Sequence, residues 1–123
     1  MNQKKFIYQL LPRLFSNRAT THKINGSIEE NGVGKFNDIS DTLLQKIKAN
    51  GYTHVWYIGI LAHASTTDYR AYGLPHEYSE IIKGKAGSPY AIRDYYDVDP
   101  DLAVNVPDRM VEFEALIRRT HAV

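Results

Sequence analysis

Apolar residues form two short clusters that are typical of strands. The first cluster, residues 6–15 (FIYQLLPRLF), is rich in strand-forming residues, and Pro12 limits its regular part to about five residues. The second cluster, residues 54–61 (HVWYIGIL), is apolar without alternation. A strand that is covered on both faces, as in a parallel sheet, has this pattern. We therefore expect two buried parallel strands, with Trp56 and Tyr57 both in the core, one toward the inside of a barrel and one beneath a helix.

Two further stretches have helical periodicity. Residues 39–50 place four apolar side chains on one face of a helix, namely Ile39, Leu43, Leu44 and Ile47. Asn37 or Asp38 can cap the start of this helix, and Gly51 can close its end. The C-terminal stretch has Pro107 near its first turn and three apolar residues along one face, Met110, Phe113 and Ile117. It predicts a second helix that runs nearly to the end of the sequence.

The predicted order is strand, loop, helix, strand, long loop and helix, which defines an α/β fold with a parallel sheet. Residues 16–35 and 62–96 are polar and contain several glycines, so we expect them to form loops. Two parallel strands with helices on one side leave backbone edges and a sheet face uncovered. The predicted architecture is incomplete, and we expect the chain to associate with itself.

Composition narrows the classes of function. The sequence is 43% hydrophobic and 24% charged with a net charge of +1, which is typical of a globular protein and disfavours nucleic-acid or membrane partners. It contains no cysteine, and its N-terminus lacks the pattern of a signal peptide, so we expect a cytoplasmic protein. The nine tyrosines suit the apolar faces and hydroxyls of sugars. Tyrosines at half-buried positions would give the same composition, so both interpretations stay open.

Three strings carry a resemblance to a known family. They are IYQLLPRLF, GVGKFNDISDTLLQKIKANGYTHVWYIGIL and SPYAIRDYYDVDPDLA, and they follow one another in the family's order and spacing. Together they resemble the opening of the α-amylase family of glycoside hydrolases. The resemblance implies a TIM-type (β/α)₈ barrel with its active site at the carboxyl ends of the strands. Residues 1–123 would then be its N-terminal portion, with strand 1, helix 1, strand 2 and helix 2.

The resemblance also implies a reaction. Family members act on α-linked glucans or malto-oligosaccharides by a retaining mechanism that uses two carboxyl groups about 5 Å apart. The corresponding Asp, Glu and Asp would follow on later strands, so we expect residues 1–123 alone to be inactive. The resemblance leaves both hydrolysis and transfer open. Two alternatives remain: an amylase-like partner subunit without catalysis, and a short self-associating carbohydrate-binding module.

The resemblance assigns candidate sugar-binding residues. Tyr90 matches the aromatic residue that stacks under the sugar whose bond is cut, and Asp94 fits the same motif, more as a brace of its loop than as a sugar contact. His63 is a weaker candidate, because it directly follows the second predicted strand. Asp99 is expected to tie a turn before a proline. Gly87 stands where the exo-acting branch carries an Asp, which favours an open-cleft or dextrin-processing specificity.

We expect no cofactor and no calcium in the first loop, while calcium elsewhere in a longer protein stays open. Some family members bind calcium in the first loop, but the corresponding stretch here is SIEENGVGK, with Lys35 in place of the last carboxylate. An ammonium group among the ligands opposes binding of a divalent cation, and its charge could replace one. His54, His76 and His121 lack the spacing of metal ligands.

Overall fold

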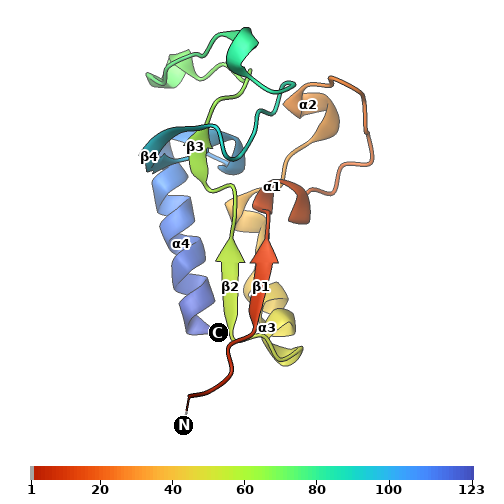
Figure 1. The fold of residues 1–123 in the computed structure, drawn as a ribbon, viewed down its shortest axis with the longest axis vertical. Helices are drawn as coiled ribbons and strands as arrows, with labels where there is room; N and C mark the ends of the chain where they lie inside the picture. The colour runs from red at the N-terminus through yellow and green to blue at the C-terminus, as the bar shows by residue number, and fades with distance from the viewer. Residues whose placement is uncertain (1) are drawn as a thin grey trace.

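Two small sheets organise residues 2–123, the part of the chain that this computed structural model describes. Strand β1 (Ile7–Leu10) pairs in parallel with β2 (His54–Tyr57), as the sequence predicts. Strand β3 (Leu61–His63) pairs antiparallel with β4 (Ile92–Val98). The arrows of β1 and β2 point toward the second sheet, and both termini lie at the opposite end of the molecule (Figure 1).

Short helices fill the connection between β1 and β2. They are α1 (Pro12–Phe15), α2 (Ile28–Asn31), the 3-10 turn η1 (Phe36–Asp38) and α3 (Asp41–Ala49). The predicted loop 16–35 therefore contains α2, which the Ser27 hydroxyl and the Glu30 carboxylate cap reciprocally. The predicted helix 39–50 is present but begins later. Ser40 is its cap, with the Ser40 hydroxyl accepting a bond from the Leu43 amide at 3.3 Å.

The second predicted strand, residues 54–61, is wrong as a single element. Strand β2 ends at Tyr57, and Gly59 has a φ of +68°, a left-handed conformation that turns the chain. A Cβ on Gly59 would lie 2.7 Å from the Leu11 side chain, so the turn also packs closely. Strand β3 begins beyond this turn at Leu61 and pairs with a different partner. The apolar run is therefore shared between two sheets.

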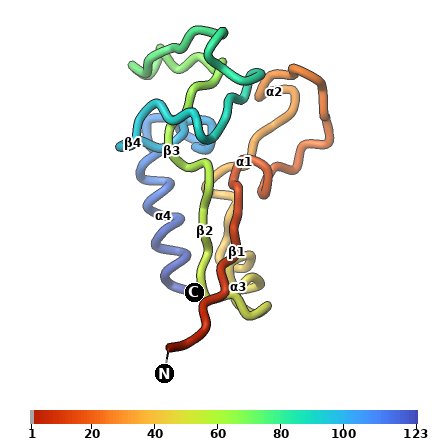
Figure 2. Tube along the Cα trace, viewed as in Figure 1, coloured from red at the N-terminus to blue at the C-terminus, as the bar shows by residue number. Residues whose placement is uncertain are grey.

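The predicted loop 62–96 contains the antiparallel sheet, which the sequence analysis missed. Leu61 pairs with Val98 and Ala62 with Asp94, so β4 bulges between those two pairs. Tyr95 and Tyr96 in the bulge are exposed. The segment between β3 and β4 includes the 3-10 turns η2 (Arg70–Tyr72) and η3 (Ser79–Ile81) and lies beyond the carboxyl ends of β1 and β2 (Figure 2).

The C-terminal helix follows two 3-10 turns, η4 (Pro100–Leu102) and η5 (Val106–Asp108). It is α4 (Arg109–Ala122), so Pro107 lies in η5 and not in the helix itself. The core joins β1, η1, α3, η4 and α4, with buried residues Leu10, Phe36, Ile39, Leu44, Ile47, Ile60, Val98, Leu102 and Leu116. Arg119 donates to the backbone carbonyls of Phe36 and Ile39, which ties α4 to the start of α3.

The parallel sheet is covered on one face. Its inner face, Tyr8, Leu10, Val55 and Tyr57, packs on the core, and the Tyr57 hydroxyl lies 2.7 Å from Thr120 on α4. Its outer face carries Ile7, Gln9, His54 and Trp56, all of them exposed. The expected core position of Trp56 is therefore wrong, because its side chain is 57% exposed. Residues 2–123 form an α/β unit with two small sheets, and they do not close a barrel.

Candidate functional site

A buried polar cluster lies at the carboxyl end of the parallel strands. His63, Asp99 and Asp101 are 3%, 1% and 1% exposed, although all three carry titratable groups. They come from the end of β3 and from the turn after β4, and Arg13 reaches them from α1. Burial of a charged group is unfavourable unless it is paired, so the partners of these groups decide what the cluster can do.

Arg13 and Tyr69 hold the two aspartates. The Arg13 guanidinium donates to an Asp101 carboxylate oxygen and lies 3.6 Å from Asp99. The Tyr69 hydroxyl donates to the other Asp101 oxygen at 2.5 Å. Burial, together with the negative charge of Asp101, raises the pKa of Tyr69, so its hydroxyl keeps its proton and acts as a donor. Both carboxylates are thus committed to contacts inside the protein.

His63 bridges the cluster to the loop above it. Its Nδ1 lies 3.0 Å from Oδ2 of Asp99, and its Nε2 lies 2.9 Å from the Ala86 carbonyl oxygen. A carbonyl oxygen only accepts, so Nε2 carries a proton, and a carboxylate opposite Nδ1 favours a proton there as well. Burial lowers the pKa of His63, but the contacts with Asp99 and Ala86 outweigh it and the net pKa is raised. These contacts favour the protonated form of the ring over the neutral form.

Lys35 also turns toward this cluster. Its ammonium donates to the backbone carbonyl of Asp101 at 2.6 Å and so links the first loop to η4. Burial lowers the pKa of Lys35, and the negative charge of Asp101 opposes that shift. Among residues 2–123, no group of three or more histidines, aspartates or glutamates could hold a metal ion. The expected absence of calcium from the first loop stays a prediction.

The loop that carries Tyr90 ends in a tight turn at the start of β4. The Ala91 amide donates to the Ser88 carbonyl at 2.9 Å, which places Pro89 and Tyr90 at the two central positions of the turn. Proline favours the first of these positions because its φ is already suitable. Tyr90 is 81% exposed. A tyrosine at the tip of a turn, with its ring in solvent, is available to stack on a ligand.

The structure places the three predicted site residues on the same antiparallel sheet or beside it. His63 pairs with Ile92, two positions after Tyr90, and Asp94 pairs with Ala62. The side chains differ, however, because Tyr90 and Asp94 are exposed while His63 is buried. The Asp94 carboxylate accepts the Tyr96 amide at 2.8 Å, which is the geometry of a loop brace.

A polar cleft borders the same loop. It has a volume of ≈ 600 Å³. It lies between the α2 region and two stretches of the segment that connects β3 to β4, residues 66–68 and 85–86. Its lining includes donors and acceptors from Arg13, Ser27, Asn31, Asp68 and Lys85. Such hydroxyl, amide and charged groups suit a ligand rich in hydroxyls.

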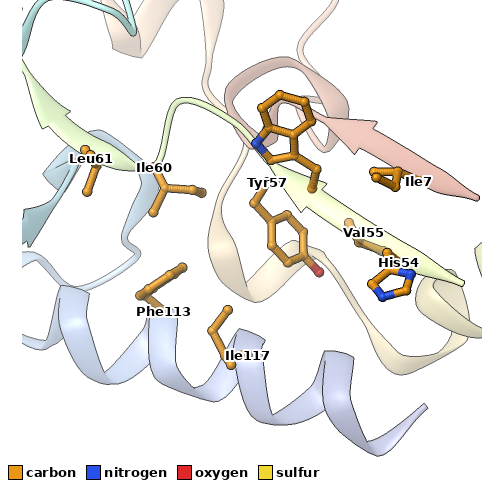
Figure 3. Close-up of a pocket in the computed structure, with 9 residues that line it drawn as sticks. Ile7, His54, Val55, Tyr57, Ile60, Leu61, Phe113 and Ile117 are labelled. Carbon is orange, nitrogen blue, oxygen red and sulfur yellow. The ribbon is translucent and has the colours of Figure 1, made fainter. Parts of the chain in front are cut away.

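A second hollow lies on the flank of β2 and has the opposite chemistry. Figure 3 shows side chains from β2 and from α4 turned toward one another across this groove. It measures ≈ 510 Å³, and its lining is mainly aliphatic and aromatic: Ile7, His54, Val55, Trp56, Tyr57, Ile60, Leu61, Phe113 and Ile117. We refer to it as the apolar groove. It offers few groups to bind sugar hydroxyls, so it is not the candidate sugar site.

The sequence analysis missed Arg13, Tyr69 and Asp101 as members of the polar cluster. Asp99 was expected to tie a turn, and it does so by accepting the Asp101 amide at 3.1 Å, but its contact with His63 was not anticipated. The available signal was a charged residue inside an apolar run at Arg13. Its partners lie 86 and 88 positions later in the sequence, beyond the reach of local patterns.

The architecture therefore belongs to the α/β class, with polar and aromatic loop residues gathered at the carboxyl ends of parallel strands. Within residues 2–123, none of the helices combines the length and the apolar character that crossing a membrane requires. Neither a protein-family model nor a curated protein matches the chain.

Among solved structures, the chain is similar to the crystal structure of an alpha-amylase from Lactobacillus plantarum. The two share 24% sequence identity with a TM-score of 0.59, and the match covers 96% of this chain and 20% of that amylase. This likeness shows an amylase-like fold. The chain spans about one fifth of the length of the amylase that it matches.

Proposed function

We propose that this chain is part of an α-amylase-type glycoside hydrolase and that it supplies an aromatic wall of the glucan-binding cleft. The exposure of Tyr90 at the tip of a braced turn carries the proposal, since a ring at 81% exposure contributes little to this chain's own core. The amylase-like fold and the polar cleft beside the same loop support it. An α-linked glucan or malto-oligosaccharide is the proposed ligand.

Stacking on Tyr90 would act on the sugar ring during bond cleavage. The ring flattens toward an oxocarbenium-like transition state, and a flat aromatic surface beneath it favours that shape over the relaxed chair. Asp94 would hold the β4 bulge through the Tyr96 amide and would not need to touch the sugar. In this scheme the residues of the chain bind and orient the substrate.

The retaining reaction itself needs an acid and a nucleophile about 5 Å apart on either side of the glycosidic bond. Asp99 and Asp101 do not suit these roles, because both are buried and paired with His63, Arg13 or Tyr69. We therefore propose that the reacting carboxylates belong to a further part of the protein. Starch hydrolysis by the 123-residue chain above the buffer rate would contradict this assignment.

A self-associating carbohydrate-binding module is the second candidate. The exposed outer face of the β1–β2 sheet and the apolar groove favour it, because a second copy could cover both. Reading the gene beyond the codon for Val123 distinguishes the candidates. A frame that continues into strands ending in Asp, Glu and Asp supports the enzyme, whereas an immediate stop supports the module.

A binding experiment tests the role of Tyr90 directly. The chain is titrated with maltoheptaose while amide chemical shifts are followed by NMR. The Tyr90→Ala variant should bind about tenfold more weakly, corresponding to about 1.4 kcal/mol. Tyr78→Ala is the matched control. Tyr78 is also 81% exposed and also lies in the segment between β3 and β4, but it precedes η3 and is not part of the turn at the start of β4. Equal losses in both variants, or no binding by the wild type, would overturn the proposal.

A further inference from the structure

His63 is the only histidine among residues 2–123 whose side chain is fully buried, and both of its ring nitrogens face acceptors. We propose that His63 is a positioning residue: it clamps the Ala86–Gly87 segment to Asp99 so that Tyr90 presents its ring at a fixed place. The proposal rests on the proposed function, because it assigns Tyr90 as the ring that receives the sugar.

The lower end of the clamp is rigid. Asp99 is 1% exposed, and its backbone amide donates to the Ile60 carbonyl at 2.8 Å. One of its carboxylate oxygens accepts the Asp101 amide at 3.1 Å, and the other lies 3.0 Å from Nδ1 of His63. The Arg13 guanidinium approaches this second oxygen to 3.6 Å. Asp99 is therefore held by two hydrogen bonds that do not involve His63, and its Oδ2 faces the imidazole.

The upper end of the clamp is the backbone just before the Tyr90 turn. Nε2 of His63 donates to the Ala86 carbonyl at 2.9 Å. The next residue, Gly87, has a φ of +74° and passes so close to β3 that a Cβ would lie 1.8 Å from the Ala64 carbonyl oxygen. On the far side of the turn, the Ala64 amide donates to the Ala91 carbonyl at 3.1 Å. Tyr90 thus lies between two points fixed to β3.

The same geometry excludes direct contact between His63 and a sugar. Its side chain is 2% exposed, its Nε2 is bonded to the Ala86 carbonyl, and its Nδ1 faces the buried Oδ2 of Asp99 at 3.0 Å. A ring in this position neither reaches a ligand nor exchanges a proton with one. Its effect on binding passes through the backbone from Ala86 to Tyr90.

Two substitutions of His63 separate its two contacts. His63→Ala removes both, whereas the side-chain amide of His63→Gln reaches the position of Nε2 and retains a donor for the Ala86 carbonyl. We expect His63→Ala to bind maltoheptaose at least tenfold more weakly than the wild type. His63→Gln should restore the affinity to within about threefold, and its amide relaxation over residues 86–90 should match the wild type.

A glycine pair supplies a test that leaves His63 intact. Gly87 and Gly84 both have positive φ, +74° and +64°, but a Cβ on Gly84 meets nothing within 4 Å. Both alanine variants carry the backbone strain of the left-handed region, and only Gly87→Ala adds the clash with β3. Gly87→Ala should therefore lower maltoheptaose affinity at least tenfold, and Gly84→Ala should change it less than twofold.

Backbone ¹⁵N relaxation measured without ligand distinguishes a failure of the clamp from a failure of the proposed function. Residues 86–90 should become mobile in His63→Ala and Gly87→Ala, while residues 76–80 keep their wild-type values. Unchanged relaxation at 86–90 in the folded variants would overturn the clamp, even if Tyr90→Ala abolishes binding. A mobile turn in a chain that never binds maltoheptaose would support the clamp and overturn the glucan assignment. If His63→Ala does not fold, His63→Gln and Gly87→Ala carry the test.

Discussion

The polar cluster and the apolar groove differ in how far their side chains find contacts within the chain. In the polar cluster, Asp101 is bonded to Arg13 and Tyr69, and Nδ1 of His63 faces Oδ2 of Asp99 at 3.0 Å without meeting the geometry of a hydrogen bond. In the apolar groove, by contrast, one edge of β2 is unpaired within residues 2–123, and Trp56 on this strand is 57% exposed. Exposed apolar surface beside an open strand edge is a site of association.

The two regions therefore lead to different expectations. The polar cluster fixes the loop at the carboxyl end of the strands without any outside group, so the Tyr90 turn can be built by this chain alone. We expect the apolar groove to be stabilised when a further strand or a second copy covers it. Three measurements test this contrast.

The largest effect is expected from breaking the polar cluster. Asp101→Ala leaves the partly buried Arg13 cation without its main partner and the Tyr69 hydroxyl without its acceptor. Removal of one member of a buried pair costs about 3–5 kcal/mol. Urea unfolding should show this loss in the free energy of unfolding, whereas Glu114→Ala, in an exposed pair with Arg118, should change it by less than about 0.5 kcal/mol. Equal effects would show that the cluster is not a special source of stability.

A smaller effect is expected from pH. The raised pKa of His63 means that the folded chain holds this proton more tightly than the unfolded chain, whose value is near 6.5. The stabilisation is therefore fully present below pH 6.5 and is lost as pH rises through the folded-state pKa. It amounts to about 1.4 kcal/mol for each unit by which the pKa is raised.

The groups that face His63 are Asp99, Arg13 and the Ala86 carbonyl, and the positive charge of Arg13 opposes the shift. Urea unfolding of the wild type and of His63→Gln between pH 5 and 9 measures the contribution, because the other titrating groups are common to both proteins. The advantage of the wild type should shrink as pH rises. An advantage that grows with pH would contradict the ion pair of His63 with Asp99.

The smallest effect is expected at the outer sheet face and the apolar groove. The chain should associate with itself, so that its average mass in light scattering rises with concentration. Trp56→Lys places a charge on this surface and should weaken association about tenfold, or about 1.4 kcal/mol. Tyr96→Lys is the control, because Tyr96 is 95% exposed in the β4 bulge and does not line the apolar groove. A wild-type chain that stays monomeric at every concentration would contradict the prediction.

Local patterns predicted the elements that depend on near neighbours. The strand at residues 7–10 was predicted from its apolar run and Pro12, and the helices α3 and α4 from periodic apolar positions. Their boundaries moved by a few residues because a cap depends on single hydrogen bonds, such as the one to Ser40. The prediction that Tyr90 and Asp94 form part of a sugar site stays a prediction; the structure gathers them at one sheet with His63, whose side chain is buried.

The sequence by itself determined two parallel strands and the two longer helices that pack beside them, because these follow from periodicity and from bonds between close neighbours. Only the tertiary structure decided that the run after Tyr57 bends at Gly59 into a second sheet, and that Trp56 is exposed. It also decided that His63 is buried against Asp99, 36 positions later in the sequence. These outcomes depend on which distant segments pack together. Burial and charge pairing arise from those long-range contacts, so a local stretch of sequence does not determine them.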